Sequence, residues 1–323
     1  MNTPNVSVSA ERSRSWFAAD LVALMRPSQF FPIWATLAAG YGSMLASQTP
    51  VPSFTHFFNQ TFWLTLLAVS MGSGAVFIYN QVADATTDRM NNKLLIIPMG
   101  LVKPSEAILW GHLLGAATLA TGVFLGKSIL TLFLICGLIG VAYSFPPARW
   151  KDQPVMALLV HVIGGGACFM SGALALVPFS QDLLIQAVPY ALAWAGVYTL
   201  VSVADSAGDR ETGKRSPAVA WGEKPALHVG VWLIVSAGVV AAFVPSVPFL
   251  LAFLPVLPFY LLILKKGRLY LFGPVKWSFL TLGLVVALWI PVFALLLVVN
   301  GLLLKLYYHY RFGLNYPNLE AGN

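Results

Sequence analysis

Four aspartates form two similarly spaced pairs in a chain that carries few charges. Asp84 and Asp88 lie four residues apart, and Asp205 and Asp209 repeat that spacing further along the sequence. Residues four apart on a helix share one face, with their Cβ atoms roughly 5 to 6 Å apart. Each pair therefore predicts two carboxylates that point in the same direction, as the oxygen ligands of a hard cation would.

Both pairs follow long apolar runs, which places them at the ends of predicted membrane helices. A carboxylate near the bilayer core costs roughly 2.5 to 3.5 kcal/mol on insertion scales, so its charge requires compensation. Mg²⁺ is usually held by one or two carboxylates together with substrate phosphates. We therefore predict that the two pairs, with Asn80 beside the first, meet around two Mg²⁺ ions that bridge a diphosphate.

A diphosphate would add negative charge that two Mg²⁺ ions do not offset, so basic side chains should complete the site. The candidates are Arg26, Lys93, Arg149, Lys151, Lys214 and Arg215. Each is also explained as a cytoplasmic anchor, because lysine and arginine concentrate on that side of membrane proteins. Tyr143 could present its ring to a cation or an acceptor, although an aromatic residue in a span can equally pack or line the interface.

The aspartates also have an ordinary structural interpretation, in which they cap helices or pair with Arg89 and Arg210. Charged loops beside membrane spans are common, so one cluster alone would not distinguish the two interpretations. Two clusters with the same spacing, repeated after four predicted spans, favour a shared function. The repetition also indicates a four-helix unit used twice.

The composition predicts an all-α, polytopic membrane protein. Hydrophobic residues make up 58% of the 323 residues and charged residues only 10%, against roughly a quarter charged in soluble domains. Apolar stretches close to the roughly 20 residues that span a bilayer recur along the chain. Nine spans are predicted, at residues 21–45, 62–83, 105–126, 128–145, 154–178, 183–204, 226–245, 247–264 and 277–304.

The basic residues set the predicted orientation. With a cytoplasmic N-terminus, the inside segments hold all 19 lysines and arginines except Lys127, Lys305 and Arg311. This predicts a cytoplasmic segment at 1–20, a transmembrane domain at 21–304 and a non-cytoplasmic tail at 305–323, with the site on the cytoplasmic side of the lipid membrane. The net charge of +7 does not indicate nucleic-acid binding, because the basic residues are scattered and form no stripe or aromatic RNA motif.

The aspartate motifs resemble those of the UbiA superfamily of intramembrane prenyltransferases. The family's NDxxDxxxD motif is matched by Asn80, Asp84 and Asp88, with Gln81 in place of its first aspartate, as in the homogentisate prenyltransferase and chlorophyll synthase branches. Its DxxGDRxxG motif is matched from Asp205 to Gly213. The stretches LMRPSQFFPIW and YSFPPARWK also resemble family segments, whereas LLIIPMG after Lys93 and the Ser216 and Pro217 positions depart from the usual pattern.

This resemblance implies nine helices around a central cavity with a lateral opening for a lipid chain. It implies that the four aspartates are catalytic and hold Mg²⁺ on an allylic prenyl diphosphate, whose prenyl group passes to a hydrophobic or aromatic acceptor with release of pyrophosphate. A terpene cyclase on the same scaffold would keep both motifs. A non-catalytic protein that binds or transports lipid diphosphates would bind the same donor without consuming it, so product analysis separates the three.

His161 and the three glycines that follow it, Gly164 to Gly166, are interpreted as a buried histidine beside a close helix contact. No acidic residue or cysteine that would complete a metal site lies near them in the sequence.

Overall fold

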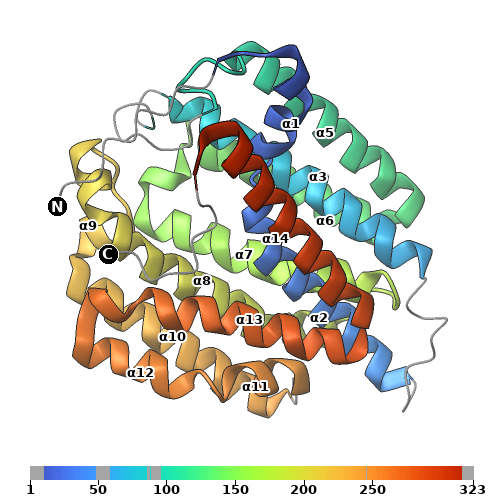
Figure 1. Cartoon of the computed structure of the whole chain (residues 1–323). Helices are drawn as coiled ribbons and strands as arrows, with labels where there is room; N and C mark the ends of the chain where they lie inside the picture. The colour runs from blue at the N-terminus through green and yellow to red at the C-terminus, as the bar shows by residue number, and fades with distance from the viewer. Residues whose placement is uncertain (1–10, 49–58, 86–87, 89–95, 245, 315–323) are drawn as a thin grey trace.

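The computed structural model describes residues 11–48, 59–85, 88, 96–244 and 246–314, and every regular element within them is helical (Figure 1). Eight helices in this part of the chain are long and apolar enough to cross a membrane, and a bent pair, α11 (Val247–Phe253) with α12 (Leu257–Lys266), brings the number to nine if it is one span. The prediction of an all-α, multi-span protein is therefore confirmed. The eight helices are α3 (Gln60–Ala83), α5 (Pro104–Leu125), α6 (Lys127–Ser144), α7 (Pro154–Leu174), α8 (Gln181–Glu211), α10 (Glu223–Phe243), α13 (Phe272–Trp289) and α14 (Pro291–Phe312).

The bundle is built around α2 (Phe30–Gln48), α7 and α8 (Figure 1). The most extensive helix contacts join α8 to α10 and to α7, α7 to α2, and α3 to α5. In Figure 1, α3, α5 and α6 lie on one side of the central helices, and α10 to α13 lie on the other. Large apolar side chains on the outside, such as Phe124 and Phe243, are more than four-fifths exposed, as is expected of a surface that faces lipid.

The contact between α2 and α7 depends on two glycines that face the opposite backbone. A Cβ atom added at Gly40 would lie 2.0 Å from the carbonyl oxygen of Phe169, and one at Gly172 would lie 1.8 Å from that of Leu37. Small residues allow this close approach of membrane helices. Gly164, which the sequence also suggested as a packing position, has open space around it instead.

We expect Gly172→Ala to destabilise the protein by about 1 to 3 kcal/mol or more, because the added methyl group must separate α2 from α7. Gly164→Ala is the matched control in the same helix, and it should be neutral or stabilising by up to about 1 kcal/mol, since alanine favours the helix. Thermal unfolding of the two variants in detergent measures the difference. Equal unfolding temperatures would show that the contact is not close.

Besides the predicted span 247–264, which the bent pair α11 and α12 divides, two further predicted spans are divided in the structure, both at a proline. The first, 21–45, is interrupted after α1 (Arg14–Leu24) by the short helix η1 (Pro27–Gln29). The last, 277–304, is split between α13 and α14 at Pro291. Proline has no backbone N–H to donate and favours the first position of a new helix. A continuous apolar run therefore contains two helices here, and the prediction of a single last span was wrong.

Because of this split, α14 turns back across the bundle toward the N-terminal helix (Figure 1). Arg311 donates hydrogen bonds of 3.0 Å from Nε and from Nη2 to the two carboxylate oxygens of Asp20. The Tyr307 hydroxyl donates a hydrogen bond of 2.7 Å to the same carboxylate. The first residues of the predicted tail therefore lie at the same end of the bundle as α1. The odd number of predicted spans had placed these residues at the end of the bundle opposite α1. Which side of the membrane the α1 end faces stays a prediction.

Candidate active site

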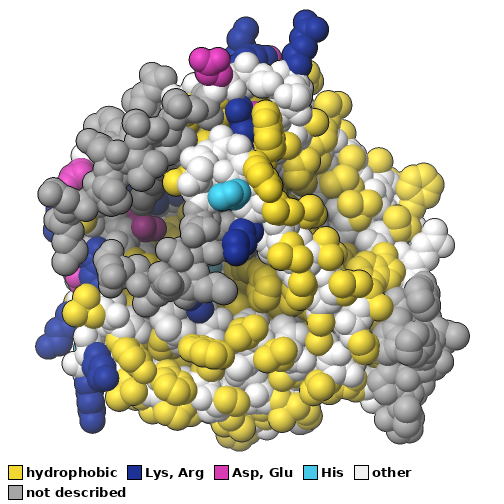
Figure 2. All heavy atoms as spheres, in the orientation of Figure 1, with side chains coloured by type: hydrophobic (Ala, Val, Ile, Leu, Met, Phe, Trp, Pro, Cys, Tyr) yellow, Lys and Arg dark blue, Asp and Glu magenta, His cyan; other side chains and the backbone are white. Residues whose placement is uncertain are grey.

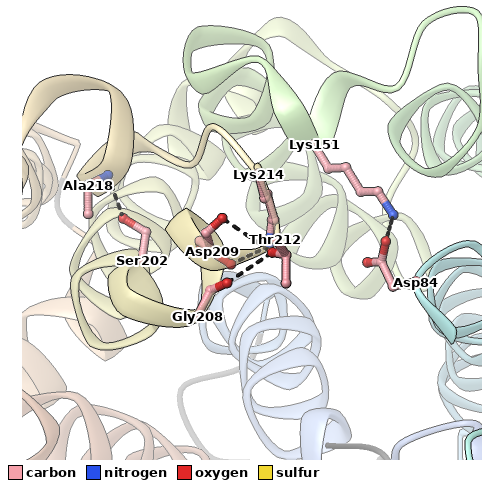
Figure 3. Close-up of polar contacts among 8 residues, drawn as sticks. All are labelled: Asp84, Lys151, Ser202, Gly208, Asp209, Thr212, Lys214 and Ala218. Carbon is pink, nitrogen blue, oxygen red and sulfur yellow. Dashed lines mark hydrogen bonds and ion pairs between the residues drawn. The ribbon is translucent and has the colours of Figure 1, made fainter. Parts of the chain in front are cut away.

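Asp84 ends helix α3, and its carboxylate forms an ion pair with Lys151 of the short helix η3 (Trp150–Asp152) (Figure 3). The Asp84 N–H donates to the Asn80 carbonyl over 3.0 Å, and the Asp88 N–H donates to the Asp84 carbonyl over 2.8 Å. These helical hydrogen bonds keep the three motif side chains in register. Lys151 is almost fully buried, and burial lowers its pKa while its hydrogen bond to Asp84 opposes that shift.

The second cluster lies where α8 ends. Gly213 has a φ of +72°, which favours glycine, and its N–H donates to the Arg210 carbonyl over 3.3 Å. The next N–H, of Lys214, donates to the Asp209 carbonyl over 2.8 Å. These two hydrogen bonds form a Schellman motif. The turn brings the Lys214 ammonium within 3.3 Å of the Asp209 carboxylate.

The loop beyond this turn is held at its far end as well. Ser202 on α8 accepts a hydrogen bond of 3.3 Å from the N–H of Ala218, which belongs to the short helix α9 (Pro217–Trp221) (Figure 3). The chain from Thr212 to Ser216 is therefore fixed at both ends against α8. Lys214 is positioned by this frame and not only by its ion pair.

The two clusters face a common space. Burial by itself would lower the pKa of Lys214, but the carboxylates of Asp209 and Asp84, with Tyr143, outweigh it and raise that pKa above its ordinary value. Lys214 is thus within electrostatic reach of aspartates from both α3 and α8. Figure 3 shows the Asp84 pair with Lys151 and the Asp209 pair with Lys214 on opposite sides of this space, and Figure 2 shows a hollow on this face with acidic and basic side chains around it.

The donor atoms of this site suit a magnesium ion. They are carboxylate oxygens, with the Asn80 amide one turn before Asp84, and hard oxygen donors are what Mg²⁺ prefers. The described residues contain no group of three or more His, Cys, Asp or Glu side chains that would enclose a metal. One or two carboxylates from each helix with a phosphate group between them is the usual composition of a magnesium site. The half-buried carboxylates of Asp84 and Asp209, each paired with a lysine, therefore fit a metal and diphosphate together.

The other predicted contacts are placed less directly. Asp205 lies one turn before Asp209 on α8 and is half-buried, and Asp88 is buried. Arg149 forms an ion pair of 2.6 Å with Asp152 of its own turn, and Arg215 is exposed. Arg26 has a φ of +53° and lies over the ring of Phe77 at 5.8 Å. Lys93 lies outside the described residues.

Gln81 does not point into the site. Its side-chain nitrogen donates to the carbonyls of Leu24, over 2.7 Å, and Phe77, over 3.0 Å, and the side chain is buried. The Leu24 carbonyl belongs to the end of α1, where the last carbonyls of a helix lack helical partners. Gln81 therefore joins α3 to the turn that carries Arg26, which gives a structural reason for an amide where the family motif has an aspartate.

We expect Gln81→Asp to destabilise the protein by about 1 to 3 kcal/mol, because an aspartate cannot donate to the buried Leu24 carbonyl and would leave it unpaired. Chemical denaturation in detergent, with Gln60→Asp at the exposed first residue of α3 as a comparison of the same substitution, measures this cost. A Gln81→Asp protein as stable as the wild type would show that the bond to α1 contributes nothing.

Three aromatic side chains lie together beside the charged clusters, and the sequence indicated only one of them. The rings of His161 and Tyr198 are stacked, with centroids 3.7 Å apart and planes 12° from parallel. The ring of Tyr143 meets His161 edge-on at 5.9 Å. Tyr143 is also within electrostatic reach of Lys214, Asp84 and Asp209, so this aromatic cluster adjoins the proposed diphosphate site.

A helical spacing in the sequence could have identified Tyr198. It lies seven and eleven residues before Asp205 and Asp209 on α8, close to whole turns of the helix, so all three share one face. His161 carries no such signal, because its approach to Tyr198 depends on how α7 packs against α8. Its interpretation as a packing residue therefore missed its neighbours.

Comparison with known proteins agrees with the resemblance that the aspartate motifs indicated. The model of the UbiA prenyltransferase family matches residues 33–272. The chain is 26% identical to the bacteriochlorophyll synthase 34 kDa chain of Chloroflexus aurantiacus over 68% of its own length and 70% of that protein. It is 24% identical to a digeranylgeranylglyceryl phosphate synthase of Methanothrix thermoacetophila over 70% of its own length and 80% of that protein.

The fold is also similar to a solved structure. A UbiA homologue from Archaeoglobus fulgidus bound to GPP and Mg²⁺ superimposes with a TM-score of 0.65 at 21% sequence identity. The match covers 86% of this chain and 99% of the other. At this identity the likeness establishes the arrangement of the helices.

Proposed function

Because this chain belongs to the UbiA prenyltransferase family and is an integral membrane enzyme of that kind, we propose that it moves a prenyl group from an allylic diphosphate to an acceptor in a magnesium-dependent reaction that releases pyrophosphate. The observation that carries the proposal is the pair of aspartate clusters on α3 and α8, in which Asp84 pairs with Lys151 and Asp209 pairs with Lys214 (Figure 3). The homologue bound to GPP and Mg²⁺ supports the choice of donor and metal.

In this proposal the aspartates Asp84, Asp88, Asp205 and Asp209, with Asn80, hold two Mg²⁺ ions, which supply Lewis-acid stabilisation to the diphosphate. Lys151 and Lys214 are already fixed beside these carboxylates and add positive charge where the leaving group gains negative charge. The bond between the allylic carbon and the diphosphate oxygen breaks, and its electron pair leaves with the oxygen.

The allylic cation must then meet the acceptor before it meets water. The apolar side chains that surround the site exclude water, which would otherwise capture the cation. The ring of Tyr143 lies beside the charged clusters, where its face can stabilise positive charge. The acceptor nucleophile donates an electron pair to the allylic carbon and completes the transfer.

The acceptor is proposed to be a hydrophobic molecule with an aromatic or related ring, or a lipid, and the site is proposed to open to the cytoplasm. The likeness to a bacteriochlorophyll synthase chain and to a digeranylgeranylglyceryl phosphate synthase supports both kinds of acceptor. The distribution of lysine and arginine supports the cytoplasmic side.

The direct test is to incubate purified protein with geranylgeranyl diphosphate and Mg²⁺, with and without acceptors, and to measure pyrophosphate and the mass of the products. A prenylated acceptor, lost when EDTA removes the metal, is the expected result. A cyclised hydrocarbon or alcohol formed without an acceptor would indicate a terpene cyclase. Tight binding of the donor without turnover would indicate a binding or transport protein.

A further inference from the structure

His161 presents an unused basic nitrogen beside the proposed reaction site. Its Nδ1 lies 2.7 Å from the Ala157 carbonyl, one turn earlier on α7. A carbonyl only accepts hydrogen bonds, so Nδ1 carries the proton and Nε2 is left with a lone pair. Within the part of the chain that the structure describes, Nε2 makes no hydrogen bond.

The surroundings fix the ring in this orientation. Tyr198 stacks on one face and Tyr143 meets its edge, so the imidazole is held between α6 and α8. The Tyr198 hydroxyl is buried beside the Tyr143 hydroxyl and makes no well-formed hydrogen bond among the described residues. Buried polar groups are ordinarily hydrogen-bonded, and an exception calls for an explanation such as an absent ligand.

The position of this aromatic cluster relative to Lys214 and the aspartates indicates the kind of ligand that it would bind. Tyr198 shares the face of α8 that carries Asp205 and Asp209. Lys214, which pairs with Asp209, is within electrostatic reach of both His161 and Tyr143. The cluster therefore lies next to the diphosphate end of the site, where the allylic carbon of a bound donor would be. Among the described residues no carboxylate forms a hydrogen bond or ion pair with His161, so the lone pair on Nε2 is available to accept a proton.

We propose that His161 is the general base of the transfer and that the acceptor is a hydroxyl-bearing molecule, a proposal that rests on the function above. The hydroxyl oxygen, or the ring carbon that it activates, bonds to the allylic carbon as the bond from that carbon to the diphosphate breaks. The proton lost by the nucleophile passes to Nε2 of His161, and the diphosphate keeps the electron pair of the broken bond. Tyr198 and Tyr143 orient the acceptor hydroxyl toward that nitrogen.

The test separates ionisation of the donor from transfer. The donor is geranyl diphosphate with ¹⁸O in the bridging position, and scrambling of the label reports reversible ionisation without an acceptor. Transfer is measured with two hydroxyl probes, homogentisate and geranylgeranylglyceryl phosphate, and with a carboxylate probe, chlorophyllide. His161→Gln keeps a polar side chain of similar length but cannot take a proton.

We expect the wild type to prenylate at least one hydroxyl probe, and His161→Gln to slow that transfer by about 10²- to 10⁴-fold, the usual contribution of a general base, while scrambling stays within a few-fold. His228→Gln is the matched control. His228, half-buried on α10, makes the same kind of bond to the carbonyl one turn earlier, that of Lys224, at a distance of 2.8 Å, and this bond is exposed. It should leave both rates unchanged.

Other outcomes contradict the proposal in distinguishable ways. Transfer by His161→Gln at close to the wild-type rate, or loss of scrambling together with transfer, would overturn the role of a general base. Transfer by the wild type to chlorophyllide alone would overturn the hydroxyl-bearing acceptor, because a carboxylate nucleophile has no proton to lose. A wild-type protein that neither scrambles nor transfers would instead refute the proposed function itself.

Discussion

Replacing Asp84 or Asp209 with asparagine is expected to lower the rate of prenyl transfer by about 10²- to 10³-fold or more, the range found when one stabilising group is removed from a transition state. Asparagine keeps the shape of the side chain but removes the charge that holds a cation and a lysine. Asp84 pairs with Lys151, and Asp209 pairs with Lys214. Either substitution therefore disturbs both the metal site and the neighbouring ammonium group.

The measurement is the rate of pyrophosphate release with saturating acceptor, and Asp182→Asn is the control. Asp182 lies in the first turn of α8, at the far end of the helix from Asp209, and is exposed. Its substitution should leave the rate unchanged. A normal rate in both Asp84→Asn and Asp209→Asn would mean that the clusters are helix caps and juxtamembrane ion pairs without a part in the reaction.

The second large effect concerns stability, and it follows from the buried ion pair between α1 and α14. Asp20→Leu should destabilise the protein by about 3 to 5 kcal/mol, because it leaves the guanidinium of Arg311 buried without its carboxylate. The side chains of Asp20 and Arg311 are 1% and 5% exposed. Chemical denaturation followed by tryptophan fluorescence in detergent measures the loss.

Two further variants show whether the unpaired buried charge causes the loss of stability in Asp20→Leu. The double variant Asp20→Leu with Arg311→Leu removes both charges and should recover much of the stability, since an apolar pair can replace a buried ion pair. Arg12→Gln breaks an exposed pair with Glu106, whose side chains are 41% and 31% exposed, and should cost no more than about 1 kcal/mol. Equal effects of Asp20→Leu and Arg12→Gln would show that burial does not determine the importance of the pair.

The sequence predicted the charged centre of the site well because its signal is local. The four-residue spacing within α3 and α8 sets the directions of the aspartates without reference to the rest of the fold. Lys214 was also predictable, since a glycine two residues after the end of a helix reverses the chain toward it. Lys151 was one of several equivalent basic candidates, and only the packing of η3 against the neighbouring helices distinguishes it from Arg149.

Features that depend on contacts between distant segments were not predictable in the same way. The role of Gln81 depends on the end of α1 lying beside α3, and the surroundings of His161 depend on the packing of α6, α7 and α8. The return of α14 was missed because an apolar run of 28 residues from 277 to 304 satisfies the length rule for one span. Pro291 was the local signal for two helices, since proline favours a helix start.

The most direct test of the central claim, that the clusters of α3 and α8 hold one diphosphate through magnesium, is the affinity of the purified protein for geranyl diphosphate, measured by calorimetry with Mg²⁺ and with EDTA. If both clusters hold the diphosphate, binding requires Mg²⁺ and is lost in both Asp84→Asn and Asp209→Asn. Binding that is equally strong without the metal, or that survives when either cluster is altered, would contradict this claim.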